Sequence, residues 1–498
     1  MLYAGPRLPI FSHNLVSANQ YPDILQTKIS KEVDEGRMAG PFLQPPMPNI
    51  HVSPIGLVPK SDGGWRMITH LSYPPSSSIN TYIDPKDTTV TYTSFDTVVN
   101  TISKLGRGAL LAKEDIKSAF RLIPVYPGDF ELLGLFFRGA YYFDKMLPFG
   151  CSISCKIFET FSTFIEWLVR RQSGLETTHH YLDDFIFAGR SDTNHCRMLV
   201  DTFHSLCTDM GIPLNKDKAQ GPTTSLVFLG LVIDTIQMQI RIPPPKIQEM
   251  LSILTHHIQK RTITINSLQS IVGKLNFFAR AIPGSRAFNR RFYNAMIGKV
   301  QPYHHVNITS AMKLDMQMWL DLLTNFNGVV YFPDSEWSSQ ETLNLFTDSS
   351  GTASLGCGSY FQGQWAYLQW PSSWANKPII HDITFLELVP IVLAFTIWAK
   401  ALRNKKIILH IDNLALVHII NKQSSSSDRV MFLIRPLMLV TIKNNIQFKA
   451  QHIPGNQNGI ADAISRQQWG RFRELAPAAD QLPQPIPTSF HNVLLKMK

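Results

Sequence analysis

Apolar residues recur at the spacing of an amphipathic helix between residues 191 and 211. Ser191 to Thr193 can cap the start of this helix, and Gly211 can end it. The apolar residues that fall on one face are Cys196, Leu199, Val200, Phe203, Leu206, Cys207 and Met210. More widely, strand-like runs alternate with helical runs from Ile55 to Ile233, which predicts an α+β or α/β layered structure.

A second helical face follows a break in the pattern at Pro243 to Pro245. Its apolar residues are Leu268, Ile271, Val272, Leu275, Phe278 and Ala279. The same segment continues through a run of basic residues, which are Arg280, Arg286, Arg290, Arg291 and Lys299. We therefore expect a helical, basic module here.

Breaks in these patterns predict how the chain is divided. Prolines and weak periodicity at the beginning favour an extension or a wrapping arm, and prolines near the end favour a flexible tail. The predicted parts are an N-terminal extension (1–45), a mixed α/β part (46–237), a helical part (238–330), a second mixed part (342–467) and a tail (468–498). The expected fold class is a multidomain protein of α+β and α/β type.

Composition narrows the class of protein. The chain has 498 residues, of which 44% are hydrophobic, so several soluble domains with real cores are expected. No run of roughly 18 apolar residues and no signal peptide is found, so we expect no membrane partner. The five cysteines form no CxxC pair, which favours a reducing intracellular compartment, cytoplasmic or nuclear. A net charge of +10 permits a polyanionic partner such as nucleic acid.

Two adjacent carboxylates, Asp183 and Asp184, lie within the apolar stretch HHYLDDFIF. Adjacent acids repel and resist burial, so they need open solvent or a cation. A hairpin tip without chemistry and an incidental acidic loop are the simpler alternatives. Asp115, at the end of an apolar strand, offers a third carboxylate. Three carboxylates can hold two Mg²⁺ ions about 3.5 to 4 Å apart, which activate a 3′-hydroxyl and neutralise a triphosphate.

The stretch LVPKSDGGWRMI predicts a basic β-hairpin. Its turn would contain Gly63 and Gly64, and its strands would carry Lys60 and Arg66. Such cations suit the binding of phosphates. A solvated hairpin without a ligand explains the same residues when they are considered alone.

Four more acids occur in the C-terminal third, and each has a structural alternative. Asp348 could open a turn. Glu387 could complete a capping box begun by Thr384, and the pair Asp412-Asn413 could cap the following helix. Asp462 could be a solvated helix residue.

Six short motifs occur in an order that resembles the motifs of reverse transcriptases. They are PKSDGGWR, DIKSAF, LPFG, YLDD, GIPLNKDK and FLG. The resemblance implies a right-hand polymerase with fingers and palm over 46–237 and a thumb or connection over 238–330. It also implies that Asp115 and Asp183 bind the metals with Asp184 in support, that Phe120 is a steric gate against a ribose 2′-hydroxyl, and that Lys218 lies near the incoming phosphates.

The C-terminal acids together resemble the catalytic set of ribonuclease H. The resemblance covers about 342–467 and implies a ribonuclease H-like α/β domain, in which four acids around two Mg²⁺ ions activate water against an RNA phosphodiester. The implied ligands are Asp348, Glu387, Asp412 and Asp462. His452 matches the family's mobile histidine. Gly356 and Gly358 fit the first hairpin, where the backbone must approach closely.

The joint resemblance is to the reverse transcriptase and ribonuclease H of Gypsy-type or DIRS-type retrotransposons, with the DIRS type preferred. It implies RNA template, DNA primer, RNA:DNA hybrid and dNTPs as partners, and Mg²⁺, with Mn²⁺ as an alternative, as cofactor. Protease, zinc-knuckle and integrase signatures are not found, so we expect a processed product, a separately encoded frame or a trimmed piece. The alternatives are a domesticated scaffold that binds RNA without catalysis and an RNA-only polymerase.

Overall fold

A computed structural model describes residues 1–60, 63–299, 301–326, 329–332, 336–338, 340–454 and 458–495. The chain divides into two compact units, Met1–Leu226 and Val227–Lys498. Among the described residues, no helix combines the length and the apolar character needed to cross a membrane. Ser61 and Asp62 of the predicted basic hairpin, and Gly455 to Gln457 of the stretch HIPGNQNG, lie outside the described residues.

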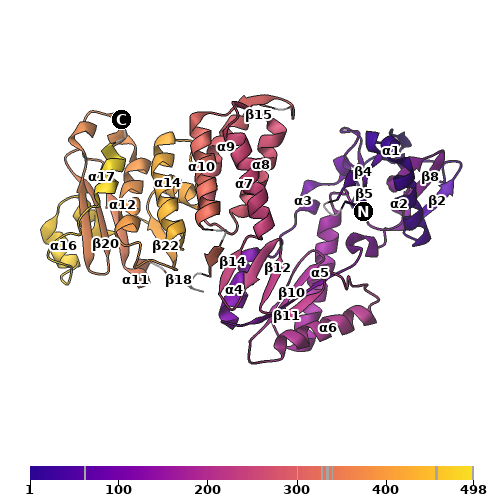
Figure 1. The fold of residues 1–498 in the computed structure, drawn as a ribbon, viewed down its shortest axis with the longest axis horizontal. Helices are drawn as coiled ribbons and strands as arrows, with labels where there is room; N and C mark the ends of the chain where they lie inside the picture. Colours follow the sequence, from indigo (N-terminus) through magenta and orange to yellow (C-terminus); the bar gives the residue numbers. More distant parts are fainter. Residues whose placement is uncertain are drawn as a thin grey trace. The chain divides into compact units, whose positions relative to one another are not determined.

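The first part of unit 1 is built on a five-stranded sheet, with a separate hairpin and two helices beside it (Figure 1). The strands of the sheet, in spatial order, are β1 (Ile10–Phe11), β3 (His51–Val52), β7 (Gly134–Phe137), β8 (Ala140–Asp144) and β2 (Met38–Phe42). The hairpin is β4 (Ile55–Pro59) with β5 (Trp65–Thr69), and the helices are α1 (Val16–Gln20) and α2 (Pro22–Asp34). The predicted basic hairpin is therefore present, with Val58 paired to Arg66.

The first 45 residues pack into this part of the structure. Ala18, Leu25 and Ile29 are fully buried in one core with strand residues such as Leu57 and Leu135. In addition, β2 pairs with β8. We expected an extension because the apolar residues of this segment recur only weakly. The structure explains the weak pattern, since α2 buries only a narrow apolar stripe and the strands are short. The segment is held by burial against strands that come later in the sequence.

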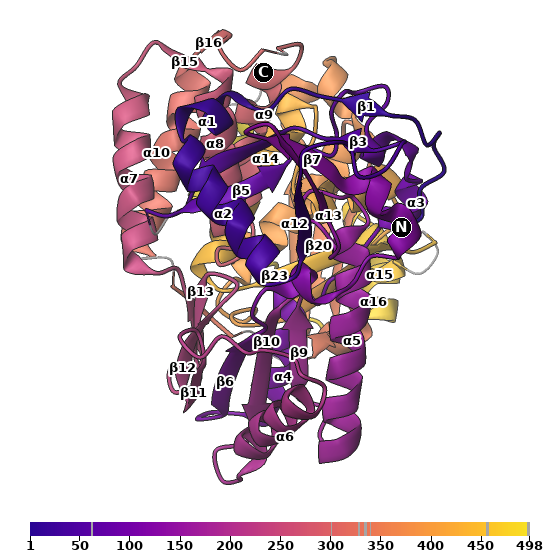
Figure 2. The same cartoon turned by 90° about the vertical axis from the view of Figure 1, so that its right-hand side faces the viewer.

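The second part of unit 1 is a four-stranded sheet covered by helices (Figure 2). Its strands in spatial order are β11 (Gln220–Thr223), β6 (Leu110–Asp115), β10 (Asp184–Gly189) and β9 (Thr178–Tyr181). Its helices are α3 (Pro85–Thr88), α4 (Phe95–Leu105), α5 (Ser154–Ser173) and α6 (His195–Asp209). The core between α5, α6 and the two central strands contains fully buried Phe158, Phe185 and Phe203.

The helix predicted after residue 191 is confirmed as α6, with its predicted apolar face buried from Cys196 to Cys207. The predicted cap at Ser191 to Thr193 is wrong, because the N-cap is Asn194 and its side chain makes no capping hydrogen bond. Thr193 Oγ1 only accepts a hydrogen bond from the His195 N–H at 3.4 Å. Gly211 follows the helix with φ of 67°. Met210 is a correction, since it is 40% exposed because it lies at the C-cap, beyond the last turn.

Unit 2 begins with a small sheet and a helical region. The sheet is β12 (Ser225–Phe228), β13 (Leu231–Asp234), β14 (Gln239–Arg241) and β17 (Val329–Tyr331), and the short pair is β15 (Thr262–Thr264) with β16 (His305–Asn307). The helices are α7 (Pro244–Ile258), α8 (Ile265–Phe278), α9 (Arg290–Met296) and α10 (Ser310–Asn325). The predicted second face is the buried side of α8, and prolines occupy the first turn of α7, where a missing N–H costs nothing.

The rest of unit 2 is an α/β arrangement. Its antiparallel sheet is β19 (Leu345–Ser349), β20 (Gly356–Phe361) and β21 (Gln364–Gln369), and its parallel sheet is β18 (Trp337–Ser338), β22 (Lys406–Ile411) and β23 (Gln447–His452). The helices are α11 (Gln340–Leu343), α12 (Ile383–Ile397), α13 (Leu414–Lys422), α14 (Asp428–Lys443) and α15 (Gly459–Ser465). The apolar helix α12 packs against β19, β20 and α14. The multidomain mixed α/β fold expected from the sequence is confirmed.

The last thirty residues also differ from the expected tail. They form α16 (Trp469–Leu475) and α17 (Thr488–Leu495). Phe472, Ala476 and Ala479 are buried with Trp365 of β21 in one cluster. The Trp365 indole N–H donates to the Asp480 carbonyl oxygen at 2.8 Å. Of the prolines that suggested disorder, Pro477 lies between the buried Ala476 and Ala479 and is tolerated there, and Pro483, Pro485 and Pro487 follow this contact.

Candidate active sites

The first group of carboxylates is set by the register of two antiparallel strands. Asp115, the last residue of β6, lies opposite Asp184, the first residue of β10. Asp183 is in the turn between β9 and β10, and its carbonyl oxygen accepts a hydrogen bond from the Ile116 N–H at 3.0 Å. The structure therefore brings the three predicted acids of unit 1 to one end of the central strands.

A lysine and an asparagine contact this group. Lys218 Nζ lies 2.8 Å from Asp115 Oδ2, and Asn215 Nδ2 donates to Asp115 Oδ1 at 3.2 Å. The Asn215 N–H also donates to the Asp115 carbonyl oxygen at 2.9 Å. Lys218 was expected near this centre, whereas Asn215 was missed. The signal for Asn215 was its place in the same GIPLNKDK turn.

Repulsion and burial change the acidity of these carboxylates. Burial, together with the neighbouring Asp184 and Asp115, raises the pKa of Asp183 to about 6. Burial and Asp115 also raise the pKa of Asp184. The hydrogen bond to Asp115 raises the pKa of Lys218, which keeps its ammonium charged. The group holds more negative charge than one ammonium offsets, so it favours additional cations.

Two glutamates of α5 contact the hairpin that carries Asp183. Leu182 adopts a positive φ of 53°, which is unusual for a residue other than glycine. Its N–H donates to Glu159 Oε2 at 3.2 Å, and the other Glu159 oxygen lies 3.1 Å from His180 Nε2. Burial opposes the charged imidazole, but contacts with Glu159 and Glu166 raise the pKa of His180 to about 9. A buried ion pair thus fixes the turn beside the acids.

The remaining predicted residues of unit 1 lie on two other segments. Phe120 is half-buried in a short 3₁₀ turn, η2 (Ala119–Leu122), and its ring centroid is 5.1 Å from Phe149 and 5.3 Å from Phe158. Lys60 and Arg66 are exposed at the end of the β4–β5 hairpin. Lys218 and the three acids are thus brought together by contacts, whereas no hydrogen bond or ion pair joins Lys60 or Arg66 to them among the described residues.

The second group of acids comes from four separate elements of unit 2. Asp348 lies in β19, Glu387 in α12 and Asp462 in α15, while Asp412 directly follows β22. The four acids lie near enough to repel one another: the charges of Asp412 and Asp348 raise the pKa of Glu387, and those of Asp462 and Asp412 raise the pKa of Asp348. His452 Nε2 lies 3.2 Å from the main-chain oxygen of Asp412.

The capping alternative for Glu387 is wrong, and the one for the Asp412-Asn413 pair holds for Asn413 alone. The N-cap of α12 is Asp382, whose side chain accepts from the Phe385 N–H at 3.1 Å, so Thr384 lies inside the helix and begins no capping box with Glu387. The N-cap of α13 is Asn413, which accepts from the Leu416 N–H at 3.0 Å. Asp412 is therefore exposed without a capping role.

Glu387 is the least satisfied of these carboxylates. Its Oε2 atom is buried and has no hydrogen-bond partner among the described residues. Burial, with the charges of Asp412 and Asp348, raises its pKa to about 8. Burial likewise raises the pKa of Asp348 to about 6, although Ser465 Oγ donates to it at 2.6 Å.

Asp462, in contrast, is stabilised in its charged form. Arg466 and Arg471 donate to its two oxygens at 2.6 and 2.7 Å. Burial opposes ionisation, but these two hydrogen bonds lower the pKa of Asp462. The alternative of a solvated helix acid is thus partly right, since its carboxylate is charged and 25% exposed.

No group of three or more His, Cys, Asp or Glu side chains in the described part of the chain is arranged to hold a metal ion as it stands. In both groups a cation already contacts one acid: Lys218 at Asp115, and Arg466 with Arg471 at Asp462. The donor set still fits Mg²⁺, which prefers carboxylate oxygen, and the unpartnered Glu387 oxygen gains most from a cation.

Comparison with known proteins identifies one part of the chain, which covers most of unit 1 and the first residues of unit 2. Residues 58–233 match the family model of the reverse transcriptase (RNA-dependent DNA polymerase). These residues are a reverse transcriptase domain. The match begins within β4 and ends within β13, and it includes Asp115, the Asp183–Asp184 pair and Lys218.

Relatives extend over more of the chain than the reverse transcriptase domain. The transposon Tf2-7 and Tf2-3 polyproteins of Schizosaccharomyces pombe are each 21% identical over 92% of this chain. The chain spans about a third of the length of these curated relatives. Two solved foamy viral protease-reverse transcriptases, one with dsDNA and one with an RNA/DNA hybrid, share the fold over 91% of the chain. The TM-scores are 0.51 and 0.53, and the sequence identities are 17% and 16%. The matched region covers 86% of the first foamy viral chain and 57% of the second. The polymerase-type fold with a further α/β domain is thus confirmed.

Gly358 allows a close contact that positions two acids. It pairs with Asp348 across β19 and β20, and a Cβ at this position would lie 2.7 Å from Ile464 Cβ of α15. We expect Gly358→Ala to lower the free energy of unfolding by about 1 to 3 kcal/mol, since helix and strand must separate. Gly470→Ala is the control, because its site in α16 is open and alanine favours a helix. Chemical denaturation measures both, and equal stability of Gly358→Ala and the parent would contradict the close contact.

Glu387 gives a pH-dependent prediction for the metal-free protein. Its pKa is raised from 4.5 to about 8 in the folded state, so the stability it contributes is present below pH 4.5 and is lost as the pH rises through 8. Glu387→Gln removes this loss. In a chelator, the Tm gain of Glu387→Gln over the parent should be larger at pH 9 than at pH 5. Glu474→Gln, an exposed carboxylate of α16, should show no such difference. An equal Tm gain at both pH values would contradict the buried, uncompensated carboxylate.

Proposed function

We propose that the chain is an RNA-directed DNA polymerase, able also to copy DNA, with a second centre that degrades the RNA strand of RNA:DNA hybrids during retroelement replication. The observation that carries the polymerase is the strand register that sets Asp115 opposite Asp184, within the reverse transcriptase domain. The ribonuclease H activity is a further proposal, and it rests on the four acids of unit 2.

In the polymerase centre, Asp115, Asp183 and Asp184 would hold Mg²⁺, with Mn²⁺ as an alternative. Bound there, the ions supply Lewis acidity that makes the primer 3′-hydroxyl a better nucleophile and neutralises the triphosphate. Lys218 balances Asp115 before the nucleotide binds, and its ammonium is then available to the phosphates. Lys60 and Arg66, exposed on the β4–β5 hairpin, add cations for the triphosphate.

Phe120 would select the sugar in this centre. Its ring is half-buried and contacts the rings of Phe149 and Phe158, so it has little freedom to move aside. A fixed ring excludes a 2′-hydroxyl by a steric clash and needs no attraction to the deoxyribose.

In the second centre, Asp348, Glu387, Asp412 and Asp462 would hold the Mg²⁺ that activates water for RNA cleavage. Glu387 supports this proposal best, since its buried oxygen has no partner among the described residues and its repulsion with Asp412 and Asp348 costs stability. His452, exposed beside Asp412, would help the product to leave.

Nucleic acids and dNTPs are the partners that this function requires: RNA template, DNA primer and RNA:DNA hybrid. The foamy viral neighbours with dsDNA and RNA/DNA hybrid support nucleic-acid partners. We propose the cytoplasm or nucleus as the location, in keeping with five unpaired cysteines. The DIRS-type origin stays a prediction beside the Gypsy type, because the similar Tf2 polyproteins are only 21% identical.

A domesticated RNA-binding scaffold is not favoured. A scaffold gains nothing from acids that repel one another, and burial of such charges costs stability. Both centres retain such buried, mutually repelling acids, as the raised pKa values of Asp183 and Glu387 indicate.

The polymerase centre is tested by Asp183→Asn. Asparagine lowers the charge facing Mg²⁺, so we expect RNA-templated dNTP incorporation to fall by about 10²-fold or more while RNA cleavage continues. Asp201→Asn, an exposed acid of α6 paired with Arg197, is the matched control. Primer extension with labelled RNA measures both activities. A hairpin tip without chemistry tolerates asparagine equally well, so extension at the parent rate would refute the assignment.

The second centre is tested by Asp412→Asn. Because Asn413 and not Asp412 caps α13, the change should leave the helix intact. We expect RNA cleavage in a hybrid to be lost while RNA-templated synthesis continues, and His452→Ala to slow turnover less severely. Asp428→Asn, at the start of α14, is the control. Normal cleavage by the Asp412→Asn protein would return the C-terminal part to the scaffold hypothesis.

A further inference from the structure

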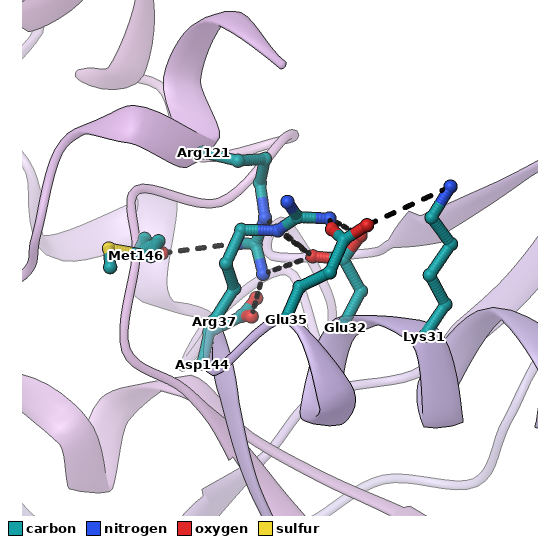
Figure 3. A network of polar contacts seen from close by, with 7 residues as sticks. All are labelled: Lys31, Glu32, Glu35, Arg37, Arg121, Asp144 and Met146. Atoms are coloured by element: carbon teal, nitrogen blue, oxygen red, sulfur yellow. Dashed lines mark hydrogen bonds and ion pairs between the residues drawn. The ribbon is translucent and has the colours of Figure 1, made fainter. Parts of the chain in front are cut away.

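Arg121 directly follows Phe120 in η2 and has an unusual position for a charged side chain. It is only 7% exposed. Its guanidinium Nη2 donates to Asp144 Oδ1 at 2.6 Å and to Glu32 Oε2 at 2.9 Å, as Figure 3 shows. Its Nη1 donates to the main-chain oxygen of Met146 at 3.3 Å. One side chain thus joins three separate segments of the chain.

One of these segments leads directly to a neighbour of the Phe120 ring. Asp144 ends β8, and Met146 immediately precedes the LPFG stretch, whose Phe149 contacts the Phe120 ring. Glu32 belongs to α2, outside the matched reverse transcriptase domain. Glu32 is itself held by Arg37, which donates to both of its oxygens at 2.7 and 2.8 Å.

The tight backbone around Phe120 couples the position of its ring to that of the Arg121 guanidinium. Ser118 and Ala119 adopt positive φ values of 67° and 35°, and η2 is a single 3₁₀ turn. The Ile123 N–H donates to the Phe120 carbonyl oxygen at 3.1 Å, and the Leu147 N–H donates to the Ile123 carbonyl oxygen at 2.8 Å. A turn with two residues in a disfavoured conformation persists only when its surroundings fix it, and here the ion cluster of Arg121 is part of those surroundings.

We propose that Arg121 is a positioning residue for Phe120, and that Glu32 of α2 thereby helps to set the choice between dNTP and rNTP. The proposal rests on the polymerase function proposed above. Without the guanidinium, Asp144 and Glu32 lose their buried partner, so β8 and α2 must rearrange to hydrate them. That movement reaches Phe120 and Phe149 through η2 and Met146, and it opens space for a 2′-hydroxyl.

Sugar choice distinguishes this role from a merely structural one. A structural ion cluster would change stability and overall activity but would leave the ratio of rNTP to dNTP incorporation unchanged. The variants are Arg121→Met, which keeps much of the apolar stem, and Glu32→Gln, which keeps the size and an acceptor oxygen and is the gentler change. Glu35→Gln is the matched control, because Glu35 pairs with Arg37 and Lys31 of the same cluster but not with Arg121.

Single-nucleotide primer extension gives kcat/KM for one dNTP and the corresponding rNTP. We expect the rNTP to dNTP ratio to rise by roughly 10-fold in Arg121→Met and by less in Glu32→Gln, as for the loss of a steric contact of methylene size. Glu35→Gln should retain the parent ratio. If Arg121→Met does not fold, Glu32→Gln decides, and a parent ratio in Glu32→Gln then overturns the proposal.

A double variant tests whether Arg121 acts through Phe120. Phe120→Val should itself raise the ratio, and adding Arg121→Met or Glu32→Gln to it should raise the ratio no further. Additive effects, or a parent ratio in both single variants, would overturn the positioning role. Absence of dNTP incorporation by the parent protein would instead refute the proposed polymerase, so the two failures are distinguishable.

Discussion

Repulsion between carboxylates held on adjacent elements is the interaction around which both units are organised. Asp115 and Asp184 face each other across two hydrogen-bonded strands, so they cannot separate unless the sheet opens. The surrounding residues respond to this constraint: Lys218 and Asn215 contact Asp115, and Glu159 holds the turn beside Asp183. In unit 2, Ser465 and two arginines partly compensate a second group, whereas Glu387 keeps one oxygen unpaired among the described residues.

The two groups differ in how they meet the same constraint. In the first, the acids share one sheet edge, so local strand register brings them together with residues that follow within one turn. In the second, a strand, two helices and a strand end each bring one acid, so packing between elements decides their approach. Close packing at Gly358 is therefore part of the chemistry of unit 2, since it sets how near α15 comes to β20.

The sequence predicted those features that depend on local pattern. The apolar faces of α6 and α8, the β4–β5 hairpin and the order of strands and helices follow from periodicity and turn residues. It did not predict which residue caps α12 or α13, because several polar residues adjoin each helix and only the backbone conformation chooses among them. Arg121 is buried partly by Glu32, 89 residues earlier in the chain, and α2 packs with residues as distant as Leu135, and spacing along the chain carries no signal for such contacts.

The packing of α16 has a practical consequence for how the protein is divided. A fragment that ends at residue 467, where the pattern of the sequence suggests a boundary, would remove Phe472, Ala476 and Ala479 from Trp365. Aromatic surface on β20 and β21 would then meet water, and a fragment with such an exposed patch is prone to self-association. The Gln484 N–H still donates to the Trp365 carbonyl oxygen at 2.7 Å, so a stable fragment has to extend at least to this residue.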